Sequence, residues 1–209
     1  MLVRDVMTTA VVTTSPGETL EEVWKVMQDR NIRHLPVVDA GRIVGVITDR
    51  DVHRGGSSLT MLHPAPTALV REVMSHPPRT AHPLDPVEDA ARTMRSLKIG
   101  CLPVVDGDAL VGIITGIDLF DALLRLTGVE KPSGRVELHL ADRPGELARL
   151  TALVSERGLN FLSVLTYPEG PNVIATVLRV NTLETRPLAA ALRQAGFVVV
   201  WPAEKPWQS

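Results

Sequence analysis

Cysteine is almost absent from this sequence of 209 residues, in which Cys101 is the single one. One cysteine excludes an intramolecular disulfide, which is typical of proteins in a reducing compartment. The opening stretch MLVRDVMTTAVV lacks the continuous apolar segment of a signal peptide. No run approaches the roughly 20 apolar residues of a membrane-spanning helix. We therefore expect a cytoplasmic protein without a membrane partner.

Aromatic residues and basic clusters are also scarce. Phe, Trp and Tyr make up 3% of the chain, and the formal net charge is −2. Nucleic-acid surfaces need basic patches or aromatic stacking platforms, so a nucleic-acid partner is not expected. Hydrophobic residues at 44% and charged residues at 22% are ordinary for a globular protein with a buried core.

The motifs of catalysis are missing as well. The six histidines form no H-E-x-x-H or similar ligand spacing, and the sequence contains no G-x-S-x-G, P-loop or G-x-G-x-x-G. We therefore predict no catalytic residue, no metal site and no enzyme activity, with an enzyme of unrecognised site as a remaining alternative. Cys101 adjoins an apolar strand and is interpreted as a small buried residue; a redox thiol is the other interpretation.

An internal duplication is the strongest feature that is present. Sliding the sequence along itself aligns Val3–Asp51 with Val70–Asp118 without a gap, with 19 identities in 49 positions. Two copies are too few for a solenoid. A pair related by a pseudo-two-fold axis, in which each copy covers the apolar face of the other, is the expected arrangement.

Each copy predicts the same order of elements. An extended segment, residues 10–14 in the first copy, precedes a helix whose apolar residues recur every three or four positions. Two nearly continuous apolar strands follow, joined by a hairpin turn, and a second helix comes after them. Residues 55–68 are predicted to be a loop. The stripes of the first helices are Leu20, Val23, Trp24 and Met27, and Val87, Ala90, Ala91 and Met94; the strands are 35–38 and 43–47, and 102–105 and 110–114.

A Thr-x-x-Asp pair closes each copy where the last strand becomes a helix: Thr48 with Asp51, and Thr115 with Asp118. One interpretation is a helix cap, with Thr accepting from a backbone N–H and Asp at the positive helix end. The other is ligand binding, because phosphorylated ligands often lie between a strand's carboxyl end and a helix N-terminus. An ionised Asp accepts hydrogen bonds from two hydroxyls at once, as a ribose presents them. The two interpretations are compatible.

The repeated segments LPVVD…VGVITDRD and LPVVD…VGIITGID, opened by DVM and REVM, resemble a tandem pair of CBS domains. The resemblance covers about residues 1–127 and implies two β-α-β-β-α copies packed through their sheets, which usually dimerise. It also implies regulatory binding of an adenosine compound such as AMP, ATP or S-adenosylmethionine in two clefts. The aspartates of the two Thr-x-x-Asp pairs, Asp51 and Asp118, would hold the ribose, with Thr48 and Thr115 beside them.

The phosphate end of the two clefts is predicted to be unequal. Arg33 and His34 precede Leu35-Pro36 in the first copy, where family members often carry basic residues, whereas Gly100 and Cys101 precede the second strand. Arg50 is a further candidate, since Arg grips phosphate bidentately and His adds charge when protonated. Lys98 is the nearest substitute in the second copy. The alternative for Arg33 and His34 is a solvated helix end.

The last third has a pattern of its own, β-α-β-β-α-β, which predicts a ferredoxin-like sheet with two helices on one face. Its strands are placed at 135–140, 160–167, 173–180 and 197–201, with a turn at 168–171. The stretch ADRPGELARL…ERGLNFLSV resembles an ACT domain, which implies dimerisation and, in many members, an amino acid at the interface. The matching positions are Asp142, Gly145 and Asn160. Simple turn geometry is the alternative for Gly145 and Asn160.

These patterns together predict an α/β (α+β) protein: two CBS repeats (1–66 and 67–127), a linker (128–133) and an ACT domain (134–209). The layout resembles accessory proteins of the acetoin-utilisation type. We expect a non-catalytic homodimer that senses an adenine nucleotide and acts on a protein target. The alternative is a dimerisation scaffold whose clefts are vestigial.

Overall fold

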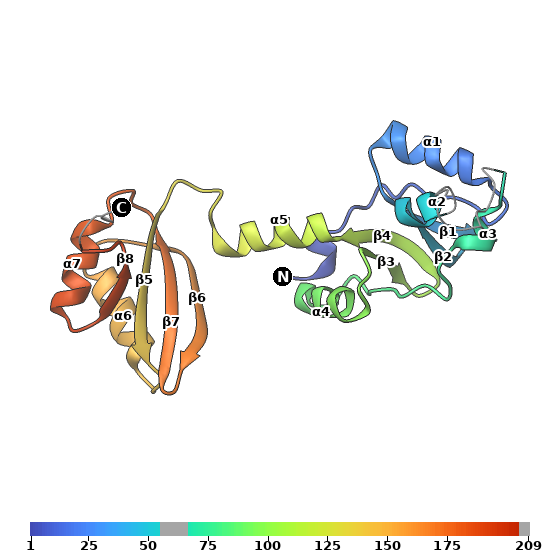
Figure 1. The fold of residues 1–209 in the computed structure, drawn as a ribbon. Helices are drawn as coiled ribbons and strands as arrows, with labels where there is room; N and C mark the ends of the chain where they lie inside the picture. The colour runs from blue at the N-terminus through green and yellow to red at the C-terminus, as the bar shows by residue number, and fades with distance from the viewer. Residues whose placement is uncertain (55–66, 205–209) are drawn as a thin grey trace. The chain divides into compact units, whose positions relative to one another are not determined.

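The computed structural model describes residues 1–54 and 67–204 and divides the chain into two compact units, Met1–Ala122 and Leu123–Ser209. Most of the predicted loop at 55–68 lies outside the described residues. Figure 1 shows the elements of both units. In order they are η1 (Val3–Asp5), α1 (Leu20–Arg30), β1 (His34–Asp39), β2 (Arg42–Thr48), α2 (Asp49–Arg54), α3 (Val70–Val73), α4 (Val87–Leu97), β3 (Cys101–Asp106), β4 (Ala109–Thr115), α5 (Gly116–Thr127), β5 (Gly134–Ala141), α6 (Glu146–Ser155), β6 (Phe161–Gly170), β7 (Val173–Val180), α7 (Arg186–Gln194) and β8 (Val198–Trp201).

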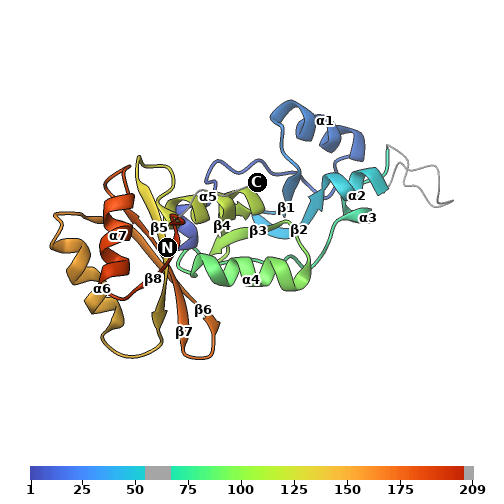
Figure 2. The same ribbon diagram turned by 60° about the vertical axis from the view of Figure 1, so that its left-hand side comes forward.

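The first helix of each copy forms where the apolar stripe predicted it. Helix α1 starts at a capping box in which Thr19 and Glu22 satisfy each other's backbone N–H groups. It ends at Asn31 in the left-handed conformation, as α4 ends at Lys98. The stripes face inward: Leu20, Val23 and Met27 are buried in α1, and Val87, Ala90 and Met94 are buried in α4. Figure 2 shows α4 lying along the sheet of its own copy.

The strands of the two copies have matching registers. His34 pairs with Thr48 in the first antiparallel sheet, and Cys101 pairs with Thr115 in the second. The register shifts after Val37 in one sheet and after Val104 in the other, and these two valines are equivalent positions of the repeat. The two copies therefore share the same backbone course, including the position at which the strand register shifts.

The extended segment at the start of each copy joins the sheet at a single residue. In the first copy only Thr14 bridges β1, with Thr14 N donating to Pro36 O and Val38 N donating to Thr14 O. Pro16 and Gly17 turn the chain immediately afterwards, so the ladder cannot extend. Ala81 makes the equivalent single bridge to Val104.

The opening segment of each copy packs into the other copy. Val3, in η1, is fully buried in the cluster formed by α4, β3 and β4, whereas Val70, in α3, is buried against α1, β1 and β2. Thr8 bridges Ile113, and Ser75 bridges Val46. In Figure 1 the N-terminus accordingly lies beside α4, and α3 lies beside the β1–β2 sheet. This exchange ties the two copies together and brings residues that follow α3 to the first sheet.

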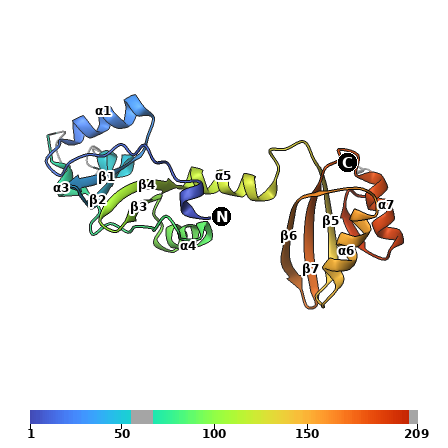
Figure 3. The same cartoon turned by 180° about the vertical axis from the view of Figure 1, so that it is seen from behind.

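The second unit has a four-stranded sheet of order β6-β7-β5-β8, with every neighbouring pair antiparallel. Both helices cover one face, as Figure 3 shows. Leu150 and Val154 of α6 and Leu188 and Leu192 of α7 pack on alternate residues of β5 and β7. This is the ferredoxin-like arrangement that the element order predicted.

One turn of this unit was predicted wrongly. Strand β6 continues through Pro168 to Gly170, and the turn lies at Pro171-Asn172, where Asn172 has φ of 59°. Asn tolerates this left-handed conformation well. Pro168 lacks an N–H, but β6 is an edge strand, where such a residue is tolerated.

Candidate ligand cleft between the two repeats

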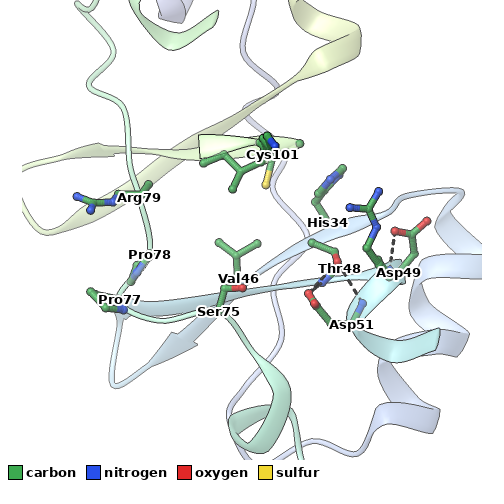
Figure 4. A pocket seen from close by; sticks show the side chains of 14 residues that line it. His34, Val46, Thr48, Asp49, Asp51, Ser75, Pro77, Pro78, Arg79 and Cys101 are labelled. Atoms are coloured by element: carbon green, nitrogen blue, oxygen red, sulfur yellow. Dashed lines mark hydrogen bonds between the residues drawn. The ribbon is translucent and has the colours of Figure 1, made fainter. Parts of the chain in front are cut away.

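A cleft of about 440 Å³ opens between the two repeats, a size typical of small-molecule sites. It is called the Asp51 cleft below. Residues of both copies line it, and Figure 4 shows how they face one another. They are His34, Val46, Thr48, Asp49, Arg50, Asp51, Ser75, Pro77, Pro78, Arg79, Lys98, Ile99, Gly100 and Cys101.

Hydrogen bonds hold the side chains of Thr48 and Asp51 together at the N-terminus of α2. Asp51 Oδ2 accepts from Thr48 N at 2.9 Å and from Thr48 Oγ1 at 2.7 Å, while Asp51 N donates to Thr48 Oγ1 at 3.3 Å. This confirms the capping interpretation. Both side chains also line the cleft, and no residue that the structure describes donates a hydrogen bond to Asp51 Oδ1. Capping therefore fixes the carboxylate and leaves one oxygen for a ligand.

The equivalent pair in the second copy has the same local geometry. Asp118 Oδ2 accepts from Thr115 N at 2.6 Å and from Thr115 Oγ1 at 2.7 Å. Thr115 and Asp118 are half-buried, at the junction of β4 with α5. They do not line the Asp51 cleft; the pseudo-two-fold relation places them in the corresponding position of the other copy.

His34 reaches across the pseudo-two-fold axis to the second copy. A Cβ atom added to Gly100 would overlap His34 Nε2, so the glycine provides the space that the imidazole ring occupies. Burial lowers the pKa of His34 from its ordinary value of 6.5, Arg33 lowers it further, and the nearby Asp49 and Asp51 oppose the shift. His34 is therefore neutral at pH 7 and can hydrogen-bond a ligand without adding charge.

The two arginines proposed for the phosphate end have different positions. Arg50 lines the Asp51 cleft, and its backbone N–H donates to Asp49 Oδ1 at 2.8 Å. Arg33 does not line the cleft: its side chain is 79% exposed, and its Nε lies 3.9 Å from Asp49 Oδ2. The solvated alternative thus describes Arg33 in this structure better than it describes His34.

Several lining residues were not proposed from the sequence. Ser75, Pro77, Pro78 and Arg79 follow α3 and reach the cleft because α3 packs into the first copy. The repeat alignment alone does not say which copy these residues contact, so it carries no signal for them. Lys98 was considered only as a substitute cation of the second copy, yet it lines the Asp51 cleft.

Cys101 lies on the wall of the cleft but is only 5% exposed. Burial raises the pKa of its thiol to about 12, so the unreactive thiol form prevails at neutral pH. This favours the interpretation of a small buried residue over that of a redox thiol.

The three positions suggested by the ACT resemblance do not come together in one chain. Asp142 and Gly145 follow the end of β5, and Gly145 has φ of 92° as the cap of α6. Asn160 precedes β6 and accepts at its carbonyl from Asn181 N, beside the start of β5. Because β5 and β6 run in the same direction across the sheet, the two groups lie at opposite ends of it.

Within residues 1–54 and 67–204, no three His, Cys, Asp or Glu side chains are grouped so that they could hold a metal ion. None of the helices in the same ranges is long and apolar enough to cross a membrane.

Family models match nearly all of the regions just described. The CBS domain model matches residues 3–56 and 70–125, and the ACT domain model matches residues 134–197. The chain therefore belongs to the CBS domain family and carries an ACT domain after its pair of CBS domains.

Individual relatives resemble the CBS pair. The CBS domain-containing protein YhcV of Bacillus subtilis is 38% identical over 56% of this chain and 81% of its own length. Inosine-5'-monophosphate dehydrogenase of Korarchaeum cryptofilum is 29% identical over 68% of this chain. The match spans only 29% of that enzyme's length, so its activity is not carried over.

Solved structures resemble the same region. The CBS pair of protein MJ0100, in complex with 5'-methylthioadenosine and S-adenosylmethionine, is 30% identical with a TM-score of 0.54 and covers 63% of this chain and 98% of that one. A putative acetoin utilisation protein (AcuB) from Vibrio cholerae is 32% identical with a TM-score of 0.53, covering 62% of this chain and 95% of that one. CBSX2 in complex with AMP is 26% identical with a TM-score of 0.53, covering 62% of this chain and 98% of its own.

Proposed function

We propose that this protein is a non-catalytic sensor that binds an adenosine compound in the Asp51 cleft and regulates a partner protein. One observation carries the proposal. Asp51 is fixed at the edge of a cleft of about 440 Å³ with one carboxylate oxygen, Oδ1, directed to no donor of the described chain. A ribose offers the two adjacent hydroxyls that such a group accepts.

The cap makes this carboxylate a good receptor for a sugar. Thr48 holds Oδ2 by two hydrogen bonds, so little side-chain freedom is lost when a ligand binds. Val46, Ile99 and the prolines supply apolar surface for a flat base within the same cleft. The adenosine ligands of the MJ0100 and CBSX2 structures support the same class of ligand for this chain.

Binding between the copies provides a mechanism of regulation. The cleft has one wall from β1, β2 and α2 and another from residues 98–101 of the second copy. A ligand that contacts both walls favours the mutual tilt that suits it, and the populations of the two arrangements shift by its difference in affinity. We propose the same role for Asp118 and Thr115 in the counterpart cleft, with Thr48 assisting Asp51 in the first.

Isothermal titration calorimetry with adenosine, AMP, ATP, 5'-methylthioadenosine and S-adenosylmethionine tests the proposal. Replacing Asp51 with Asn removes the charged acceptor and should weaken binding about 10- to 100-fold, the usual value of hydrogen bonds to a charged group. Asp121→Asn is the matched control, since Asp121 is exposed on α5 and does not line the cleft. If none of the five compounds binds the wild-type protein, the proposal is contradicted and the scaffold alternative is supported.

We also propose that the protein is a cytoplasmic homodimer. Its support is the group of large apolar side chains exposed on α5, because exposed apolar patches commonly mark interfaces. They are Ile117, Phe120, Leu123, Leu124 and Leu126. Sedimentation velocity should show a dimer for the wild type and a shift toward monomer for Phe120→Asp; a monomeric wild type at micromolar concentration would refute this part.

A further inference from the structure

The charged side chains of the Asp51 cleft include one more cation than carboxylates. Arg50, Arg79 and Lys98 line it, against the carboxylates of Asp49 and Asp51. Within the described chain none of these three cations forms an ion pair, whereas Asp49 lies 3.9 Å from the guanidinium Nε of Arg33. The three cations outnumber the two carboxylates, and an excess of positive charge in a cleft raises the local concentration of anions.

The counterparts of these three cations in the other copy are uncharged. The alignment of the two repeats relates Arg50 to Ile117, Arg79 to Val12 and Lys98 to Asn31. The structure supports this correspondence, because Asn31 and Lys98 cap α1 and α4 in the same conformation. These three cations are therefore specific to the Asp51 cleft, whereas its Gly100 has the cationic Arg33 as counterpart.

Lys98 carries the clearest sign of a role beyond folding. It has φ of 55° and ψ of 39°, and Asn31 has φ of 52° and ψ of 44°. Asn adopts this left-handed conformation readily, while a Lys there is uncommon. Residues kept in unfavourable conformations are often found at ligand sites. The helix cap accounts for the conformation, and the place of this lysine on the wall of a cleft makes it available to a ligand.

We infer that the Asp51 cleft selects phosphorylated adenosine compounds, such as AMP or ATP, over adenosine, 5'-methylthioadenosine and S-adenosylmethionine. Lys98 is the principal determinant, and Arg50 and Arg79 add to the positive potential. Arg79 lies on the side of the cleft away from Asp51, so it attracts the anion without sharing the ribose contact (Figure 4). This inference rests on the proposed function, because it presumes that Asp51 binds the ribose.

Three variants test the inference, each compared with the wild type by calorimetry at low and physiological salt. Lys98→Asn and Arg79→Val install the residues of the counterpart positions. Arg92→Asn is the control: it removes the same charge from α4 at a site that does not line the cleft. Thermal unfolding of each unliganded variant reports on the fold.

The wild type should bind AMP at least tenfold more tightly than adenosine, and salt should weaken AMP binding more than adenosine binding. Lys98→Asn should lower AMP affinity about tenfold, the value of one charge-assisted contact, and leave adenosine affinity unchanged. Arg79→Val should have a smaller effect in the same direction, and Arg92→Asn none. Lys98→Asn should not lower the unfolding temperature, since Asn suits the conformation better.

Failure of the inference and failure of the proposed function give different results. If adenosine or S-adenosylmethionine binds as tightly as AMP, or if Lys98→Asn weakens adenosine and AMP equally, the phosphate selectivity is refuted and the sensor survives. If the variant unfolds at a lower temperature with AMP affinity intact, Lys98 has a structural role only. If no adenosine compound binds the wild type, the proposed function fails and the selectivity with it.

Discussion

The two CBS copies of this chain share a backbone and differ where a ligand would lie. Their strands pair in equivalent registers with a shift at the same place, and their first helices end at left-handed residues. Leu35 and Leu102 are both fully buried. At the cleft, by contrast, His34 corresponds to Cys101, and Lys98 corresponds to Asn31.

This contrast shows which positions a duplicated fold constrains. A buried side chain has neighbours in close-packed contact, so it is restricted in both copies alike. A side chain that faces a cleft has solvent on one side and can differ without cost to the scaffold. His34 and Gly100 are the instructive exception, because one copy's side chain fills the space left by the other copy's glycine. The two copies thus differ at the pseudo-two-fold axis through two residues, His34 and Gly100, that fit each other.

The largest expected effect tests the equality of the two cores. Leu35→Ala and Leu102→Ala each leave a cavity in a fully buried site and should lower the free energy of unfolding by about 2–5 kcal/mol. Urea unfolding measures both, with Leu84→Ala as the control because Leu84 is 53% exposed. A cost in one copy alone would show that the two cores do not contribute equally.

The next largest effect on stability concerns the opening segment of each copy, which packs into the other copy. A Cβ added to Gly45 would lie 2.6 Å from Met74 Sδ, and one added to Gly112 would lie 2.6 Å from Met7 Sδ. Gly45→Ala and Gly112→Ala should therefore each cost about 1–3 kcal/mol through overpacking. Gly17→Ala, which meets no atom within 4 Å, is the control. If the two glycine variants are as stable as the control, the segments do not pack in the exchanged positions.

A smaller effect is expected where the copies meet at His34. Gly100→Ala should force the imidazole ring off its rotamer at a cost of about 1 kcal/mol. The double variant Gly100→Ala/His34→Ala should remove that penalty. A double-mutant cycle measured by thermal or urea unfolding should therefore show a coupling of about 1 kcal/mol, as for other residues in contact. Strict additivity would show that the ring and the glycine are not in contact.

The smallest effect is a dependence of stability on pH. Burial lowers the pKa of His34, so the unfolded chain binds a proton more readily than the folded one. Stability should therefore fall as the pH drops below about 6.5, and the fall should level off below the pKa of the folded state. His34→Gln should remove this part of the profile in urea unfolding from pH 5 to 8. Cys101, the counterpart residue, does not titrate in this range. An unchanged profile in the variant would assign the dependence to other groups.

Much of this protein could be inferred from its sequence, because the forces involved act over short distances. The stripes of α1 and α4, the strand pairs and the Thr48–Asp51 cap follow from helical and strand periodicity and from hydrogen bonds between residues three apart. The repeat and the ferredoxin-like order of the last third follow from the same local patterns. Even the turn at 168–171 was missed by only a few residues.

The tertiary structure alone decided which residues meet in the cleft. The exchange of Val3 and Val70 between copies, and with it the placement of Arg79, depends on contacts between segments that are far apart in the sequence. Arg33 and His34 are adjacent in sequence, yet one is solvated beside Asp49 and the other is half-buried against Gly100. Arg33 immediately precedes β1 and His34 begins it, so the packing of the whole copy determines which of them faces a ligand.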